Sequence, residues 1–257
     1  MIYRPEQTKI NQILQKLAAS SVATSQWLNK HGLDKRSAYQ YVKNNWLESL
    51  GTGAYKRYGD SVSWEGALSA IQSQLSLEIH VGARTALEMQ GKAHNVSFSS
   101  NKSFLFTSTK SSLPKWFQLQ KWQNDIKLVK TQFLNPEIGI RDLELNNFKI
   151  RISSVERAIL EALYLVPKTQ DFQECYYLME GLMDMRPKTI QVLLEECKSV
   201  KVKRLFLFMA KKAKLPLLKK LDSSRIDLGS GKRVIIPGGK LDLEYQITYP
   251  REFAVNE

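Results

Sequence analysis

The pattern of apolar and polar positions predicts a helix-rich N-terminal region. Apolar residues recur at helical spacing from Ile10 to Leu17, and Pro5 suits a first helical turn. Residues 5–19 are therefore expected to form a first helix. Thr24 then stands where an N-cap would open a short second helix, because its hydroxyl can accept a first-turn amide hydrogen.

A third helix is predicted in HGLDKRSAYQYVKNNW, residues 31–46. Gly32 permits a sharp backbone turn, and Asp34 is a good N-cap. A stripe of residues four apart is suited to packing inward; it consists of Ala38, Val42 and Trp46. The opposite side carries Arg36, Gln40, Lys43 and Asn44. Taken alone, such a side is a solvated polar face.

The residues that follow change this interpretation. In LESLGTGAYKRYG, Gly51 and Gly53 bracket a tight turn, and Ala54 to Tyr58 have strand character. Two helices, a turn, a third helix and a small hairpin follow the order of a winged helix-turn-helix. The third helix of that arrangement enters the major groove of DNA. The order of elements therefore favours a DNA-reading face over a solvated one.

The rest of the chain predicts a sheet followed by helices. A fourth helix is expected from Trp64, and another short helix within residues 80–94. From about Asn95 the pattern alternates, which predicts an antiparallel sheet with a hairpin turn at Asn146-Asn147. The expected strands are VSFSS, SFLFTST, WFQLQKW, IKLVKTQF and DLEL–NN–FKIRIS.

Capping signals predict the helices of the C-terminal part. A capping box at Ser153 to Glu156 opens an apolar helix, and Asp171 with Glu174 repeats the device. Pro187 begins a further helix, a basic helical stretch follows, and the tail predicts a closing hairpin around Pro237-Gly238-Gly239. The fold class is therefore α+β. The expected domains are a winged helix-turn-helix with connecting helices over residues 1–95 and a sheet-and-helix domain over residues 96–257.

Charge and composition narrow the class of partner. The 257 residues carry a formal net charge of +13, which favours a polyanionic partner. The densest apolar run, LFLFMA (205–210), is too short to span a bilayer, and the N-terminus lacks the apolar core of a signal peptide. Cys175 and Cys197 have no His or Cys at metal-ligand spacing. We therefore expect a cytoplasmic protein without a disulfide framework, a metal, a cofactor or a membrane partner.

Several stretches resemble the AbiEi-type antitoxins. They are SSVATSQWLNKHGLDKRSAYQYVKNNWLESLGTGAYKRYG, SWEGALSAIQSQL, HVGARTALEMQGKAH, LPKWF, SSVERAILEAL, SVKVKRLFLF and IDLGSGKR, in that order. The resemblance implies a winged helix followed by an antitoxin domain. It further implies repression of the protein's own toxin–antitoxin operon and counteraction of a nucleotidyltransferase-like toxin encoded beside it. In this type IV arrangement the two proteins need not form a stable complex. Ala83 stands where the family suggests a second glycine, so a less strained backbone is expected there.

The resemblance and the helix pattern together predict contacts to double-stranded operator DNA. Arginine can bridge the two acceptors of guanine, and glutamine can pair with adenine. Base-edge contacts are expected from Arg36, Tyr39 and Gln40. Phosphate contacts are expected from Thr24, Ser25, Lys35, Ser37 and Lys43, with Asn44 on the same side. Contacts from the wing to the flanking DNA backbone or minor groove are expected from Lys56, Arg57 and Tyr58.

A second basic region spans residues 198–220, with Leu205, Phe206, Phe208 and Met209 as expected core anchors. It is either a solvated basic face or a contact surface for an acidic partner or nucleic acid. The candidates for antitoxicity are Lys201, Lys203, Arg204, Lys211 and Lys212.

The alternative is a DNA-binding protein with a metal-dependent nuclease domain. Asp142, Glu144 and Lys149 echo the carboxylates and lysine of such a site, but simple strand alternation also places both carboxylates on one face. GSGKR (229–233) lacks the strand and helix that flank a phosphate loop. We therefore expect an operon repressor with antitoxin function, and no enzyme.

Overall fold

The N-terminal helices and a short sheet build the first of two units in the computed structural model. The model describes residues 9–93, 101–108 and 111–254. The predicted domain boundary at residue 95 and the predicted strand VSFSS lie outside these ranges. The first unit contains residues 1–79, 110–123 and 142–151, and the second contains residues 80–109, 124–141 and 152–257.

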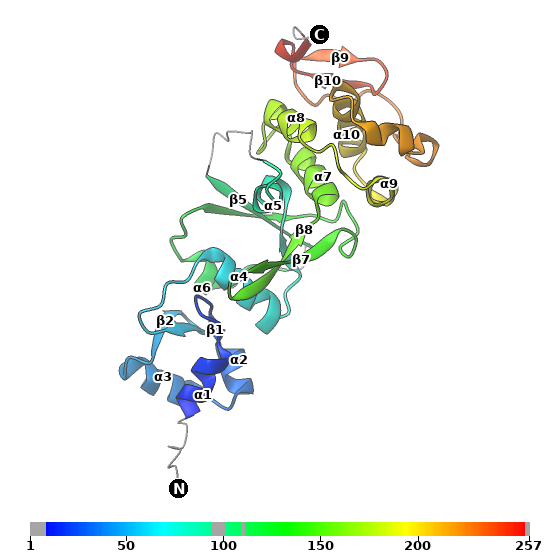
Figure 1. Ribbon diagram of the computed structural model, residues 1–257. Helices are drawn as coiled ribbons and strands as arrows, with labels where there is room; N and C mark the ends of the chain where they lie inside the picture. Colours follow the sequence, from blue (N-terminus) through cyan, green and yellow to red (C-terminus); the bar gives the residue numbers. More distant parts are fainter. Residues whose placement is uncertain (1–8, 94–100, 109–110, 255–257) are drawn as a thin grey trace. The chain divides into compact units, whose positions relative to one another are not determined.

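The first unit is a winged helix-turn-helix with two added helices (Figure 1). Its helices are α1 (Lys9–Lys16), α2 (Ser25–Lys30), α3 (Lys35–Lys43), α4 (Trp64–Gln74) and α6 (Lys115–Gln118). Its antiparallel strands are β1 (Ala23–Thr24), β2 (Leu47–Gly51) and β3 (Ala54–Arg57), in the order β1-β3-β2. The predicted order of helices and hairpin is confirmed. The prediction of a strand at WFQLQKW is wrong, because the helix α6 begins at Lys115, directly after Pro114.

The predicted inward stripe of the third helix is only partly correct. Ala38 is buried in a cluster that includes Ile13 and Leu28, and Val42 packs against that cluster. Trp46, by contrast, is 42% exposed. The reason is that α3 ends at Lys43 and Asn45 adopts a positive φ of 56°, so Trp46 no longer follows helical spacing.

The five-stranded sheet is mixed, where an antiparallel one was predicted. Its strands are β4 (Ile79–Val81), β5 (Lys102–Thr107), β6 (Asp125–Lys130), β7 (Ile140–Leu145) and β8 (Phe148–Ser153), in the order β6-β5-β4-β8-β7. β5 pairs with β6 and β4 with β8 in parallel, because connecting segments return the chain to the same edge. The turn Asn146-Asn147 between β7 and β8 is as predicted.

Helices of the second unit pack around α7. They are α5 (Ala83–Met89), α7 (Val155–Leu165), α8 (Phe172–Glu180), α9 (Pro187–Glu196) and α10 (Val200–Lys212), followed by short 3₁₀ turns at Pro216–Lys220, Ser223–Arg225 and Glu252–Ala254. α7 contacts the other four helices (Figure 1). A hairpin of β9 (Lys240–Asp242) and β10 (Ile247–Tyr249) precedes the last of these turns. Its turn lies between these strands and not at the predicted Pro237-Gly238-Gly239.

Local caps explain where these helices begin. Asp171 caps α8, and Pro187 occupies the first turn of α9, both as predicted. The cap of α7 is Ser154, one residue later than predicted. Ser153 instead donates from its hydroxyl to Glu161 Oε2 at 2.7 Å.

A buried carboxylate joins α7 to the strand β4 and the start of α5. Glu161 Oε1 lies 2.9 Å from His80 Nε2 and accepts from Arg157 Nε at 2.8 Å, and Oε2 accepts from the backbone N–H of Ala83 at 3.1 Å. Burial opposes ionisation, but His80 and Arg157 outweigh it and lower the pKa of Glu161 to about 2. Every oxygen of this carboxylate is therefore satisfied within the core.

The backbone beside Glu161 leaves no room for larger residues. A Cβ on Gly82 would lie 2.3 Å from Glu161 Oε2 and 2.4 Å from a ring carbon of Phe106. Ala83 has a positive φ of 50°, so the expectation of a relaxed backbone at this alanine is wrong. The amide of this residue donates to Glu161 Oε2.

Candidate nucleic-acid interface

The candidate interface is the outer face of α3, and its position is set by two residues before the helix. Gly32 adopts a φ of +75°, which an L side chain rarely adopts, and this turns the chain into α3. The Asp34 carboxylate accepts the Ser37 amide at 2.8 Å, and hydrogen bonds from Ser37 lower the pKa of Asp34. The cap is therefore ionised and fixes the first turn, as predicted.

The predicted DNA-facing residues of α3 are brought together on one exposed side. The exposed members are Lys35, Arg36, Tyr39, Gln40, Lys43 and Asn44, while Ser37 is half-buried. Tyr39 is 56% exposed, so it does not belong to the core. The Lys43 ammonium lies 4.9 Å from the Tyr39 ring centroid, which is a cation–π contact. This face therefore offers two basic side chains at its start and one at its end.

One of the residues predicted to hold phosphates serves the fold instead. Thr24 is buried, and its hydroxyl accepts the Trp27 amide at 3.1 Å as the cap of α2. Its side chain does not reach the surface, so the predicted phosphate contact is corrected. Ser25 is half-buried, and its backbone N–H donates to the Gly53 carbonyl at 2.9 Å.

The basic residues of the wing are also engaged within the unit. Lys56 pairs with Glu48 at 2.9 Å and donates to the Asp60 carbonyl at 2.7 Å, so its side chain is 15% exposed. Arg57 donates to the carbonyls of Leu14 and Leu17 at the end of α1. Contacts from these two side chains to DNA stay predictions, and both side chains are already bonded within the unit.

The segment around α6 contacts the wing, whose tip residues Gly51 and Thr52 stay exposed. Gln120 Nε2 donates to the Leu50 carbonyl at 2.6 Å, and a Cβ on Gly51 would lie 3.2 Å from Trp116 Cβ. Of the three predicted wing residues, Tyr58 keeps an exposed side chain, at 56%. Sequence reasoning missed this contact because α6 lies more than 50 residues after the wing.

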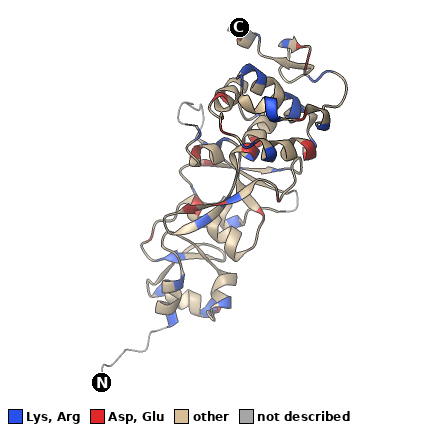
Figure 2. Cartoon of the chain, turned by 45° about the vertical axis from the view of Figure 1, so that its right-hand side comes forward, with Lys and Arg blue, Asp and Glu red and all other residues tan. Residues whose placement is uncertain are grey.

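α2 adds polar groups that the sequence analysis did not include. Gln26, Asn29 and Lys30 are exposed on α2, which contacts α3. The available signal was their position opposite the buried Leu28. Figure 2 shows Lys and Arg positions, in blue, on the helices of this unit and again on α10.

In the basic region on α10, two of the residues predicted to be available to a partner are buried. Lys203 and Arg204 are 4% and 3% exposed. The guanidinium of Arg204 donates to four backbone carbonyls, those of Leu228, Gly229, Gly231 and Gln246. Arg204 therefore anchors the segment after α10, and a solvated face at these two residues is excluded.

Of the other three antitoxicity candidates, one bonds to backbone carbonyls within the unit and two have side chains that reach the surface. Lys201 donates to the carbonyls of Tyr164 and Val166, both at 2.6 Å, and burial lowers its pKa to about 8. Lys211 is exposed and pairs with Glu244. Lys212 is half-buried above the Phe208 ring, 5.9 Å from its centroid.

The residues of the nuclease alternative lie on the β7–β8 hairpin. Asp142 and Glu144 share its exposed face, and Glu144 pairs with Lys149 at 2.7 Å. Within the described ranges, no group of three or more His, Cys, Asp or Glu is placed to hold a metal ion. Cys175 and Cys197 are buried free thiols. No helix in the described part of the chain has the length and apolar character needed to cross a bilayer.

The fold and the exposed α3 face define a winged-helix regulator with an appended α+β unit. Residues 6–98 match the family described as "Transcriptional regulator, AbiEi antitoxin N-terminal domain", and residues 100–250 match "Transcriptional regulator, AbiEi antitoxin, Type IV TA system". The chain belongs to this AbiEi family of antitoxin transcriptional regulators.

One solved structure shares the fold over nearly the whole chain. It is the crystal structure of the RV2827C protein from Mycobacterium tuberculosis, with a TM-score of 0.62 and 12% identity. The match covers 99% of this chain and 97% of that one. A search of curated proteins gave no match.

Proposed function

We propose that this protein represses its own toxin–antitoxin operon by binding inverted repeats in the promoter through α3. The observation that carries the proposal is the exposed outer face of α3 on a winged-helix framework. Arg36 and Gln40 lie one helical turn apart on that face, at the spacing from which side chains reach neighbouring base edges. Lys35 and Lys43 stand at its two ends, where they would neutralise phosphates and fix the register.

The wing has a smaller part in this proposal than the sequence predicted. Because Lys56 and Arg57 hold Glu48 and the end of α1, their charges are already engaged. Tyr58 and the exposed polar groups of α2 are then the flanking contacts that support backbone binding. Affinity would depend on salt mainly through the lysines of α3, since each neutralised phosphate releases counterions.

The second function we propose is counteraction of a nucleotidyltransferase-like toxin encoded beside the gene. It is supported by the family match over residues 100–250 and by a second unit larger than a dimerisation appendage requires. Among the five candidates, Lys211 and Lys212 have side chains at the surface. A direct and stable complex with the toxin is not required by the proposal.

The repressor proposal is tested with the full-length chain and a labelled duplex of its own promoter. Fluorescence anisotropy should show tighter binding to the promoter than to a scrambled duplex of equal composition, by a factor of at least about 10³. Equal affinity for the two duplexes would contradict sequence-specific repression. A fragment ending at residue 95 is a poorer probe, because it lacks the α6 segment that contacts the wing.

Antitoxicity is tested separately by growth rescue, with the toxin expressed from an unrelated promoter. Rescue by a chain that carries the Arg36→Ala substitution would show that neutralisation does not depend on repression. Loss of rescue in a variant that no longer binds DNA but remains folded would contradict two separable functions.

A further inference from the structure

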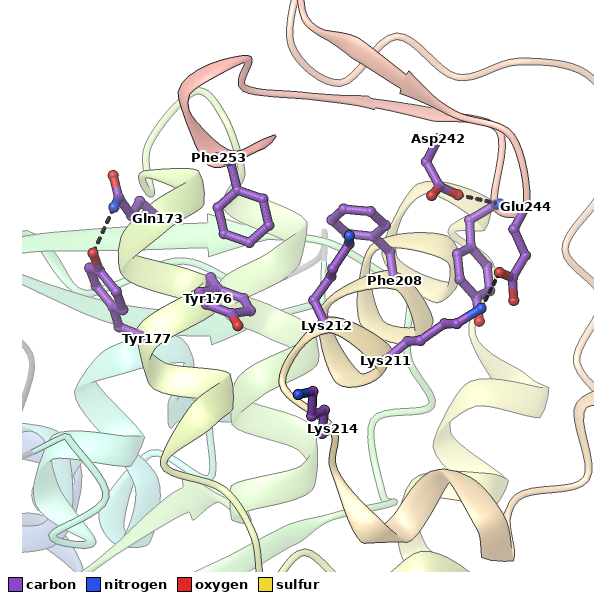
Figure 3. Close-up of a pocket in the computed structure, with 11 residues that line it drawn as sticks. Gln173, Tyr176, Tyr177, Phe208, Lys211, Lys212, Lys214, Asp242, Glu244 and Phe253 are labelled. Carbon is purple, nitrogen blue, oxygen red and sulfur yellow. Dashed lines mark hydrogen bonds and ion pairs between the residues drawn. The ribbon is translucent and has the colours of Figure 1, made fainter. Parts of the chain in front are cut away.

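A cleft in the second unit is lined by none of the residues proposed to contact DNA. It lies between α8, α10, the β9–β10 turn and the C-terminal 3₁₀ turn, with a volume of about 640 Å³ (Figure 3). Small-molecule sites commonly have volumes of about 300–1,000 Å³. The size therefore suits a single small ligand.

Aromatic rings line one side of this cleft. The Phe253 ring meets Tyr176 edge-on, with centroids 4.6 Å apart and an interplanar angle of 82°. Phe208 forms the buried base, 6.3 Å from Phe253 between centroids. Phe253 and Tyr176 are half-buried, so each presents part of a ring to a ligand. Planar aromatic groups stack on such rings whatever their substituents.

Charged groups line the rest of the cleft. Lys211, Lys212 and Lys214 reach it from the end of α10, and Lys214 is exposed. Asp242 reaches it from the end of β9 and Glu244 from the β9–β10 turn, with Glu244 paired to Lys211 (Figure 3). Ammonium groups bind phosphate oxygens, and carboxylates accept hydrogen bonds from sugar hydroxyls or exocyclic amines.

We infer that this cleft binds a nucleotide, with its base against Phe253 and Tyr176 and its phosphates at Lys212 and Lys214. A nucleotide is the ligand class that joins a planar ring, hydroxyl donors and a polyanion within this volume. The same chemistry has two sources, a free mononucleotide or the terminal nucleotide of an RNA strand. The site is independent of the operator-binding face on α3.

The experiment is isothermal titration calorimetry of the full-length chain with ATP, AMP, adenosine and inorganic triphosphate. ATP should bind more tightly than either adenosine or triphosphate, because only ATP engages both sides of the cleft. Phe253→Ala should weaken ATP at least about fivefold, the lower bound for losing one stacked base. Lys214→Ala should weaken ATP while leaving adenosine unchanged. A short oligoadenylate that binds more tightly than AMP would assign the site to an RNA end, and weaker binding would assign it to the free nucleotide.

Controls separate the cleft from other basic surfaces. Lys219→Ala removes an exposed lysine outside the cleft, and Arg36→Ala removes charge from α3; both should bind ATP as the parent chain does. Phe253→Leu keeps apolar volume but loses the ring, so it distinguishes stacking from misfolding. Absence of ATP binding at millimolar concentration, equal affinity for triphosphate and ATP, or unchanged affinity in the folded Phe253→Leu and Lys214→Ala variants would overturn the inference.

Discussion

Arg157 and Glu161, one turn apart on α7, form an ion pair at 2.8 Å in which the carboxylate is completely buried. The same guanidinium donates from Nη1 to the carbonyls of Asn135 and Ile138, at 2.6 and 2.7 Å. The pair therefore connects the helix to the loop before β7 as well as to β4. These two residues come from SSVERAILEAL, one of the stretches that carry the family resemblance.

Glu161→Gln should destabilise the protein by about 3–5 kcal/mol, because it leaves the Arg157 charge buried without its partner. Urea unfolding followed by circular dichroism measures the change. Glu144→Gln is the matched control: that carboxylate is exposed in its pair with Lys149, so the expected change is below about 1 kcal/mol. Equal effects of the two substitutions would contradict the role of the buried network.

Acid should weaken the second unit through Glu156 and Glu161. Burial opposes ionisation of both, but Arg186 at Glu156 and His80 with Arg157 at Glu161 lower each pKa from 4.5 to about 2. A lowered folded-state pKa contributes stability that is fully present above pH 4.5 and lost as the pH falls toward 2. Urea titrations between pH 5 and 3 should show a falling free energy of unfolding, with a smaller slope in Glu161→Gln. An unchanged slope would contradict this assignment.

Arg204→Ala should destabilise the chain by about 3 kcal/mol or more, because it leaves several backbone carbonyls without their charged donor. Lys219→Glu alters an exposed lysine of the same basic stretch and should change stability by no more than about 0.5 kcal/mol. Thermal unfolding of both variants makes the comparison. An Arg204→Ala variant that unfolds at the same temperature as the parent would show that the guanidinium does not anchor this segment. Charge reversal at this position therefore cannot test antitoxicity.

The two lysines at positions 35 and 56 should differ in their effect on DNA binding. Lys35→Ala should weaken all duplexes alike and reduce the salt slope by about 0.9, the value for one phosphate contact. Lys56→Ala should leave both quantities near the parent's, since this ammonium holds Glu48 and the Asp60 carbonyl. Anisotropy titrations from 50 to 200 mM salt test the pair. If Lys56→Ala reduced the affinity and the salt slope more than Lys35→Ala does, the wing would be a phosphate contact after all.

Local signals predicted much of the fold. Asp34, Asp171 and Pro187 begin helices as expected, since caps depend on neighbouring residues alone. Strand pairing was harder: alternation predicts a strand but does not reveal its partner, so the parallel pairs of β5–β6 and β4–β8 were missed.

In the candidate site, too, local features could be predicted from the sequence and long-range contacts could not. The exposed side of α3 followed from helical spacing, which placed Arg36 and Gln40 on one face. Long-range contacts determine the roles of the other basic residues. Arg57 donates to a carbonyl near the end of α1, and Arg204 donates to carbonyls more than 20 positions later in the chain. A basic residue type does not distinguish a surface charge from a buried anchor, because both use the same side chain.

The most direct test of the central claim is the affinity of Arg36→Ala for the protein's own promoter duplex, measured by anisotropy at fixed salt. The account predicts a loss of roughly 1–3 kcal/mol on the promoter and a much smaller loss on a scrambled duplex. Arg141→Ala, which removes an exposed arginine from β7, should bind both duplexes as the parent does. Promoter binding by Arg36→Ala as tight as that of the parent chain would contradict α3 as the reading face.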